Sequence, residues 1–283
     1  MMKKRHLLEK PWFLRLALVG LIAGVLFIYS FVLNSDHSLL CGDSPRADSS
    51  AAQIQLSAIL HYATSRIVPQ QTLTEITVSF DVLQSLASCN FLVFGLGFDS
   101  LMWSSLNARG DTLFLEEDPK WVQTVLKDAP TLRVHTVRYR THLSEADDLL
   151  STYGSVPECK PPKAYLRGNN RCKLALSDLP DEVYDKEWDL IMIDAPRGYF
   201  LEAPGRMAAI FSAAVMARAR VRPGVTHVFL HDVDRRVEKV YAEEFLCRKY
   251  LVGSVGRLWH FEIPPTANLS RASDSTGFCK NEP

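Results

Sequence analysis

Three side chains that can move protons or hold a cation follow two apolar runs of the sequence. Asp194 comes directly after Leu190–Ile193, and His231 and Asp232 come directly after Thr226–Leu230. The carboxyl ends of neighbouring parallel strands meet at one edge of a sheet, so these three residues are expected to share a crevice. There they can accept a proton from a hydroxyl group, and the two aspartates can bind a divalent metal cation. The alternative is that each aspartate caps a following helix.

A glycine turn followed by acidic residues indicates a nucleotide cofactor. The apolar run Phe91–Phe94 leads into Gly95 and Gly97, and Glu116 and Glu117 follow the next apolar run. Glycines permit a tight turn and a close approach of the backbone to a cofactor, and a carboxylate after the next strand binds ribose hydroxyls. The alternative is a strand-to-helix turn that only needs small residues.

The residues after the turn separate one cofactor from another. Ser100 stands where a dinucleotide turn has its third glycine, and Asp99 places a negative charge where a pyrophosphate would lie. S-adenosylmethionine has no phosphate and carries a cationic sulfonium. The sequence therefore predicts S-adenosylmethionine as the cofactor. The residues predicted to bind it are Gly95, Gly97, Asp99, Glu116 and Glu117.

Arginine and aromatic residues lie close in sequence to the strand-end acids, and we predict that they bind the substrate: Arg197, Tyr199, Arg206 and Arg235. Guanidinium groups match carboxylates with two hydrogen bonds, so an anionic substrate is expected. Ion pairing with Glu202 or Asp234 is the alternative for these arginines.

Apolar runs alternate with helical patterns over residues 51–265, which predicts an α/β fold with a mostly parallel sheet and helices on both faces. The predicted strands are Phe91–Phe94, Thr112–Leu115, Arg133–Tyr139, Leu190–Ile193, Thr226–Leu230 and Leu258–Ile263. The predicted helices are Ile54–Ser65, Phe80–Ala87, one from Ser100, Lys120–Lys127, Pro204–Arg218 and Val237–Cys247. Tyr153–Lys173 is expected to be a loop, and residues 266–283 an irregular tail.

The N-terminal segment predicts a membrane anchor. Residues 16–33 carry no charge and would form about 27 Å of helix, close to the thickness of the bilayer core. Five basic residues precede this run, which places residues 1–15 in the cytosol and the main body in a lumen. Residues 34–50 are rich in Ser, Asp, Gly and Pro and are predicted to be a stem. A cleaved signal peptide is the alternative.

Composition bears on partners and on the redox compartment. The chain of 283 residues has 32 basic and 32 acidic side chains, so it has no global basic field and nucleic acid is not an expected partner. All six cysteines follow the predicted anchor, which favours disulfides in an oxidising lumen. Cys159 and Cys172 can close a loop, although the sequence leaves the pairing open, with scattered free thiols as the alternative. Asn268 lies in a glycosylation acceptor motif.

Several longer runs resemble the plant glucuronic acid 4-O-methyltransferases of cell-wall polysaccharides. These runs are Asn90–Gly97, Asp99–Trp103, Leu113–Asp118, Trp188–Pro196, Glu202–Met207 and His231–Val233. The resemblance covers nearly all of residues 51–263. Phe98, Asp234 and the Tyr165–Asn169 segment look more like the branch that acts on arabinogalactan than the branch that acts on glucuronoxylan.

The resemblance implies a Rossmann-like, S-adenosylmethionine-dependent methyltransferase, anchored in the Golgi membrane by one helix with its catalytic domain in the lumen. It implies methylation of O4 of glucuronic acid on an acidic polysaccharide or a glycoprotein glycan. It assigns Gly95, Gly97 and Glu116 or Glu117 to the cofactor, and it assigns Asp194, His231 and Asp232 to chemistry. Two alternatives stay open: glucuronoxylan as the acceptor, and a non-catalytic Golgi scaffold in polysaccharide assembly.

Overall fold

The computed structural model describes residues 45–67, 69–266 and 277–279. Contacts divide the chain into one unit before residue 49 and another from residue 49 onward, and the fold described below is that of the second unit. Among the helices of the described residues, none is both long and apolar enough to cross a membrane. The predicted anchor over residues 16–33 and the acceptor residue Asn268 lie outside the described residues, so both stay predictions.

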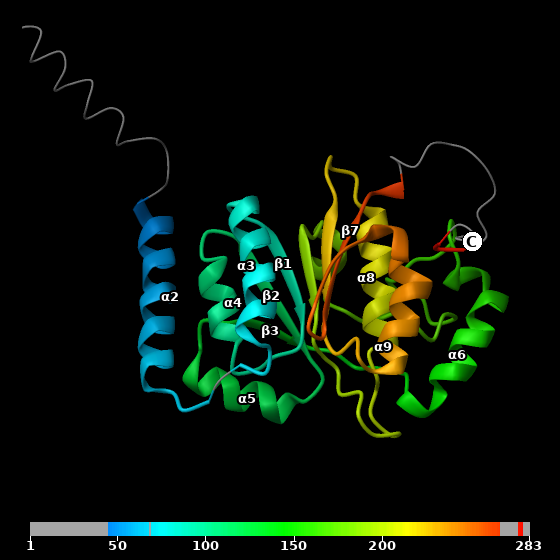
Figure 1. The fold of residues 1–283 in the computed structure, drawn as a ribbon, viewed down its shortest axis with the longest axis horizontal. Helices are drawn as coiled ribbons and strands as arrows, with labels where there is room; N and C mark the ends of the chain where they lie inside the picture. Colours follow the sequence, from blue (N-terminus) through cyan, green and yellow to red (C-terminus); the bar gives the residue numbers. More distant parts are fainter. Residues whose placement is uncertain (1–44, 68, 267–276, 280–283) are drawn as a thin grey trace, which may run out of the picture. The chain divides into compact units, whose positions relative to one another are not determined.

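A mostly parallel, Rossmann-like sheet forms the centre of this unit (Figure 1). In the described part of the chain it has seven strands in the order β3-β2-β1-β4-β5-β7-β6. The strands are β1 Asn90–Phe94, β2 Asp111–Glu116, β3 Arg133–Thr136, β4 Leu190–Ile193, β5 Thr226–Leu230, β6 Leu251–Val255 and β7 Leu258–Ile263. The first five are parallel, and β7 is antiparallel to both of its neighbours. The predicted α/β sheet is confirmed.

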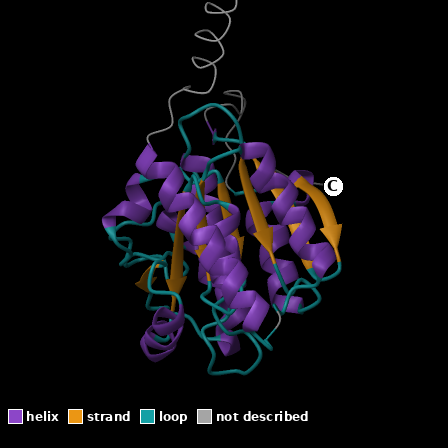
Figure 2. Ribbon diagram, turned by 90° about the vertical axis from the view of Figure 1, so that its left-hand side faces the viewer, coloured by secondary structure: helices purple, strands orange, loops and turns teal. Residues whose placement is uncertain are grey.

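Helices cover both faces of the sheet because the apolar side chains of each strand alternate between two buried clusters (Figure 2). Phe91 and Phe114 point to the cluster under α2 Pro45–Thr64, α3 Leu73–Leu86, α4 Ser100–Leu106 and α5 Pro119–Asp128. Leu92 and Leu113 point to the opposite cluster. That cluster packs against α6 Ala146–Thr152, α7 Asp181–Asp185, α8 Met207–Ala219 and α9 Arg236–Tyr241.

Several element boundaries differ from the sequence-based expectations. Helix α2 begins at Pro45, within the stretch predicted to be a stem, and α3 begins at Leu73 because Thr72 and Glu75 form a capping box. Strand β3 ends at Thr136 rather than at Tyr139. Helix α9 gives way at Ala242–Leu246 to a π-helical turn. Strand β6 and helix α6 were not expected, since both are short and weakly apolar.

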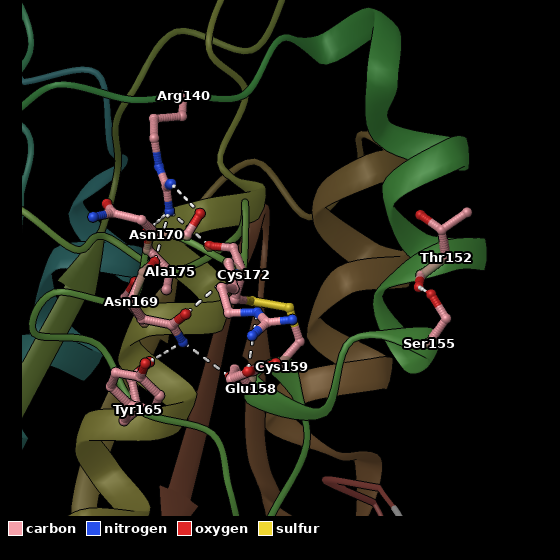
Figure 3. Close-up of a disulfide and its surroundings, with 12 residues drawn as sticks. Arg140, Thr152, Ser155, Glu158, Cys159, Tyr165, Asn169, Asn170, Cys172 and Ala175 are labelled. Carbon is pink, nitrogen blue, oxygen red and sulfur yellow. Dashed lines mark hydrogen bonds and ion pairs between the residues drawn. A yellow bond between two sulfur atoms is a disulfide. The ribbon is translucent and has the colours of Figure 1, made fainter.

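The predicted Tyr153–Lys173 loop is held in place by a disulfide and a buried amide (Figure 3). Cys159 and Cys172 form the disulfide, which confirms the pairing that the sequence only suggested. Asn169 is fully buried; its side chain donates to the carbonyls of Glu158 at 2.9 Å and Tyr165 at 2.8 Å. A second disulfide joins Cys247 to Cys279, whereas Cys89 is a buried free thiol.

Candidate active site

A cleft of about 330 Å³ opens at the carboxyl edge of the parallel strands. This volume lies in the range typical of cofactor and small-molecule sites. Its lining combines the turn after β1, the acids after β2, the segment after β4 and residues after β5. The predicted site residues among the lining are Gly95, Gly97, Asp99, Glu116, Glu117, Asp194, Arg197, Tyr199, Arg206, Asp232 and Arg235. Sequence reasoning therefore found most of the cleft, and His231 lies just behind it.

The turn after β1 requires glycine at position 95, while a side chain at position 97 would displace the carboxylate of Asp99. Gly95 has φ +125°, and a Cβ there would lie 3.1 Å from the Cβ of Ala195. A Cβ on Gly97 would lie 2.9 Å from Oδ1 of Asp99. The backbone of the turn therefore runs directly along the cleft wall, where a bound molecule can approach it closely.

The two glutamates after β2 have different hydrogen-bond partners. Glu116 accepts hydrogen bonds from the backbone N–H groups of Leu96 and Asp118, each at 3.0 Å, and so fixes the glycine turn. Glu117 pairs with Nε of Arg197 at 3.2 Å, while its Oε2 is buried without a hydrogen-bond partner. Burial raises the pKa of both carboxyl groups. The unpaired Oε2 of Glu117 is suited to accept a hydrogen bond from a hydroxyl group of a bound nucleoside.

Asp99 places a half-buried carboxylate in the cleft wall. Its Oδ2 accepts the indole N–H of Trp103 at 2.8 Å. Burial, and then the charge of nearby Asp194, raise the pKa of Asp99 to about 6. A carboxylate in this position favours a cationic ligand over an anionic one.

Helix α2 is bonded to the segment that follows the glycine turn. The hydroxyl of Tyr62 donates to the carbonyl of Phe98 at 2.6 Å and accepts the backbone N–H of Met102 at 3.1 Å. Burial raises the pKa of Tyr62 to about 12, so the phenol keeps its proton. The indole of Trp121 donates to the carbonyl of Leu96 at 2.7 Å. The cofactor turn is thus braced by side chains from both α2 and α5.

Asp194 and His231 form a hydrogen-bonded pair at the inner end of the cleft. Nδ1 of His231 lies 2.8 Å from Oδ1 of Asp194, and Gln71 donates to Oδ2 at 3.2 Å. Burial alone would raise the pKa of Asp194, but the hydrogen bond with His231 and the charge of Arg206 outweigh it and lower that pKa. His231 is only 1% exposed, so Asp194 is the member of the pair that reaches the cleft.

A second carboxylate lies behind His231. Nε2 of His231 has no hydrogen-bond partner and lies 3.7 Å from Oε1 of Glu75, which is itself 1% exposed. Glu75 also accepts the backbone N–H of Arg257 at 2.7 Å. Sequence reasoning missed Gln71, Glu75 and Arg257. The capping box at Thr72 marks the start of a helix, but no local pattern connects α3 with the end of β5.

Asp232 is held by arginines. Arg206 donates to its Oδ2 at 2.8 Å, Arg235 pairs with the same oxygen at 3.0 Å, and Arg257 pairs with Oδ1. Asp232 has a φ of 62° and is 4% exposed. Three guanidinium groups on one carboxylate favour a positioning role for Asp232, and its predicted part in the chemistry stays a prediction.

The tentative metal site of Asp194 and Asp232 does not fit the arrangement of charges. Ligand atoms of these residues and of His231 do lie within 4.8 Å of one another. However, Arg206 bonds to both carboxylates, at 3.3 Å and 2.8 Å, so a cation between them would have to displace a buried guanidinium. We therefore derive no chemical step through a metal at this cluster.

The predicted substrate residues separate into a buried arginine and an exposed group. Arg206 is 4% exposed and donates to the backbone carbonyls of Asp194 and His231, so its geometry favours positioning over contact with a substrate. Arg197 and Arg235 line the cleft, paired with acids of the protein. Tyr199 is 69% exposed and lies on the lining of the same cleft. Arg197, Arg235 and Tyr199 are therefore placed to meet a molecule entering from solvent.

The fold and the cleft define a class of protein, a Rossmann-like fold whose cleft, lined by a glycine turn and by carboxylates, suits a nucleoside-containing, cationic cofactor. The chain belongs to the IRX15/IRX15L/GXM family, whose family model matches residues 74–261.

Relatives in Arabidopsis thaliana define the class more closely. Arabinogalactan O-methyltransferase 1 is 61% identical over 96% of this chain and 98% of its own length. Glucuronoxylan 4-O-methyltransferase 1 is 48% identical over 78% of each chain, and Protein IRREGULAR XYLEM 15 is 40% identical over 83% of this chain and 73% of its own length. By class, the chain is an O-methyltransferase.

A solved methyltransferase-like protein from Silicibacter pomeroyi is 14% identical, covers 70% of this chain and 89% of its own, and superposes with a TM-score of 0.36. This similarity is too weak to bear on function.

Proposed function

We propose that this chain transfers a methyl group from S-adenosylmethionine to O4 of glucuronic acid residues on arabinogalactan. The observation that carries the proposal is the Asp194–His231 pair, which opens into the same cleft as the glycine turn. The relative named for arabinogalactan methylation, 61% identical to this chain, supports the choice of acceptor.

The cleft residues fit the cofactor. Gly95 and Gly97 leave room beside the backbone, and the orphaned Oε2 of Glu117 can accept a ribose hydroxyl. Asp99 offers a negative charge to the ammonium or sulfonium of the methionine part. Bound here, S-adenosylmethionine would supply an electrophilic methyl group to an acceptor hydroxyl.

The residues of the chain position the acceptor and remove its proton. Arg197 and Arg235 attract the uronate carboxylate, and Tyr199 offers a ring on which the sugar can stack. The hydrogen bond with His231 lowers the pKa of Asp194, so this carboxylate is ionised at neutral pH. Asp194 would accept the hydroxyl proton as the methyl–oxygen bond forms and the methyl–sulfur bond breaks, with S-adenosylhomocysteine as the leaving group. His231 holds Asp194 in place through Nδ1. Alignment of the two reactants contributes much of the acceleration.

The acceptor is tested by a direct comparison. The purified full chain is incubated with methyl-labelled S-adenosylmethionine and either de-methylated arabinogalactan or de-methylated glucuronoxylan. We expect label on O4 of glucuronate in arabinogalactan and at least tenfold less in glucuronoxylan. The reverse preference would assign the chain to the xylan reaction, in line with its 48% identity to a glucuronoxylan 4-O-methyltransferase. No transfer to either, with S-adenosylmethionine bound, would favour the scaffold.

We also propose a Golgi location, with one membrane helix at residues 16–33 and the catalytic domain in the lumen. The uncharged run with its basic flank supports this topology, and the two disulfides support an oxidising compartment. Protease digestion of intact microsomes tests it. The catalytic domain should be protected until detergent is added, and digestion without detergent would refute the topology.

A further inference from the structure

A second group of possible metal ligands lies on strands β5 and β7, away from the cleft. His227 of β5 is paired in register with Glu262 of β7, and His260 is two residues before Glu262. Because side chains of a strand alternate between faces, His260 and Glu262 point to the same face of the sheet. Contacts between the two strands put His227 on that face as well.

The distances within this group suit a tetrahedral cation. Nδ1 of His227 lies 3.0 Å from Nε2 of His260 and 3.8 Å from Oε1 of Glu262, and the three ligand atoms lie within 4.8 Å of one another. Metal–ligand bonds of about 2.0–2.1 Å at tetrahedral angles put zinc ligands about 3.3 Å apart. Small side-chain rotations, with Glu262 exposed at 43% of its side chain, would bring all three ligands to one point.

The surroundings of the two histidines also suit a bound cation. His227 and His260 lie between strands β5 and β7, and His260 is only 7% exposed. Arg220, the nearby cation, pairs with Asp189 at 2.9 Å, which offsets its charge.

The contrast with the cluster in the cleft strengthens this inference. There, Arg206 bonds to both carboxylates, whereas no lysine or arginine of the described chain is ion-paired with Glu262. The two groups are also well separated, because His227 precedes His231 by four residues of strand, about 13 Å. A cation at His227 therefore cannot take part in the reaction at Asp194.

We propose that His227, His260 and Glu262 form a binding site for a zinc-like divalent cation, with the fourth position open to water. Two histidines and one glutamate are a ligand set that zinc commonly takes. The cation would tie the antiparallel strand β7 to the parallel part of the sheet.

The test is a zinc titration of the purified full chain after removal of metals with EDTA. Calorimetry should show one Zn²⁺ per chain, and saturating zinc should raise Tm by about 5 °C, since a ligand that binds only the folded state stabilises it. His260→Gln and Glu262→Gln should each weaken zinc binding at least about tenfold. The matched control is His135→Gln, which alters another strand histidine paired with a glutamate, Glu182, and should leave zinc affinity unchanged.

The side chain of Glu262 is 43% exposed, so Glu262→Gln should fold even if His260→Gln does not. The Glu262 variant alone then still tests the site. Absence of zinc binding to the folded wild-type chain would overturn the proposal and leave a simple His–His hydrogen bond. Binding that survives both substitutions would also overturn it. Binding lost in Asp194→Asn but kept in Glu262→Gln would place the metal in the cleft instead.

Discussion

The half-buried carboxylate of Asp99 should destabilise the folded protein while it helps to bind the cofactor. In the wild type, the indole N–H of Trp103 donates to Oδ2 of Asp99 at 2.8 Å. Asp99→Asn removes the negative charge and keeps an oxygen that can accept this hydrogen bond. The substitution should therefore make the unliganded protein more stable and weaken its binding of S-adenosylmethionine.

The expected stability change follows from the pKa of Asp99, which rises from 3.8 to about 6 on folding. The folded state then binds more protons than the unfolded state between these two values, so this group lowers stability as pH rises through that window. At about 1.4 kcal/mol per pKa unit, the cost above pH 6 is at most about 3 kcal/mol. Asp99→Asn should raise the free energy of unfolding at pH 7.5 by up to about 3 kcal/mol and leave it almost unchanged at pH 3.5.

Urea unfolding of wild type and Asp99→Asn at both pH values measures this difference, with the exposed Asp128→Asn on α5 as the control. Calorimetry at pH 7.5 should show S-adenosylmethionine affinity reduced about tenfold or more, the scale of a hydrogen bond to a charged group. Equal stability of the two proteins at pH 7.5 would refute the raised pKa. Unchanged cofactor affinity would refute the contact between Asp99 and the cationic part of the cofactor.

Four further variants test other parts of the site and fold. Asp194→Asn should lower kcat at least about a hundredfold in the methyl-transfer assay, the scale of a positioned proton acceptor, while Tm and cofactor affinity stay near wild type; near-normal turnover would show that Asp194 is not the proton acceptor. If Glu75 acts through His231, Glu75→Gln should lower kcat about tenfold without changing KM for S-adenosylmethionine. A change in Tm with unchanged kcat would mean that the role of Glu75 is only structural. Gly97→Val should abolish cofactor binding in calorimetry with an unchanged circular dichroism spectrum, because its Cβ would lie 2.9 Å from Asp99; retained binding would contradict the assigned turn. Replacing Cys159 and Cys172 together by serine should lower the urea-derived unfolding free energy by about 3 kcal/mol, the loop-closure effect of a 13-residue separation, and an unchanged value would show that the Asn169 hydrogen bonds suffice.

The sequence predicted the central strands well because their apolar runs are continuous. The parallel strands Leu190–Ile193 and Thr226–Leu230 have the predicted bounds. The antiparallel strand Leu258–Ile263 also has the predicted bounds, although His260 and Glu262 interrupt its apolar run. Fully buried parallel strands carry apolar residues on both faces, so they stand out against the polar turns. Strand β6, with Gly253 and Ser254 at its centre, gives no such signal and becomes a strand only by pairing with β7.

Site residues could be predicted from the sequence only where they directly follow a predicted strand. Asp194 and His231 each follow an apolar run, and the structure brings them to 2.8 Å. Gln71 and Glu75 reach the same place from the start of α3, far away in sequence, where no local pattern could mark them. The sequence suggested that Arg206 binds the substrate. In the structure its guanidinium is buried and donates to Asp232 and to two backbone carbonyls.

The bonds of Tyr62 limit how the chain can be shortened. Helix α2 immediately precedes the catalytic fold, and a version of the protein cut after residue 64 to remove the N-terminal region would lose the phenol that bridges Phe98 and Met102. The cofactor turn would then lack one of its braces, and a trimmed enzyme would bind S-adenosylmethionine poorly even with every cleft residue intact. A shortened enzyme should therefore begin before α2. Domain exchanges within this family should transfer α2 together with the sheet against which it packs.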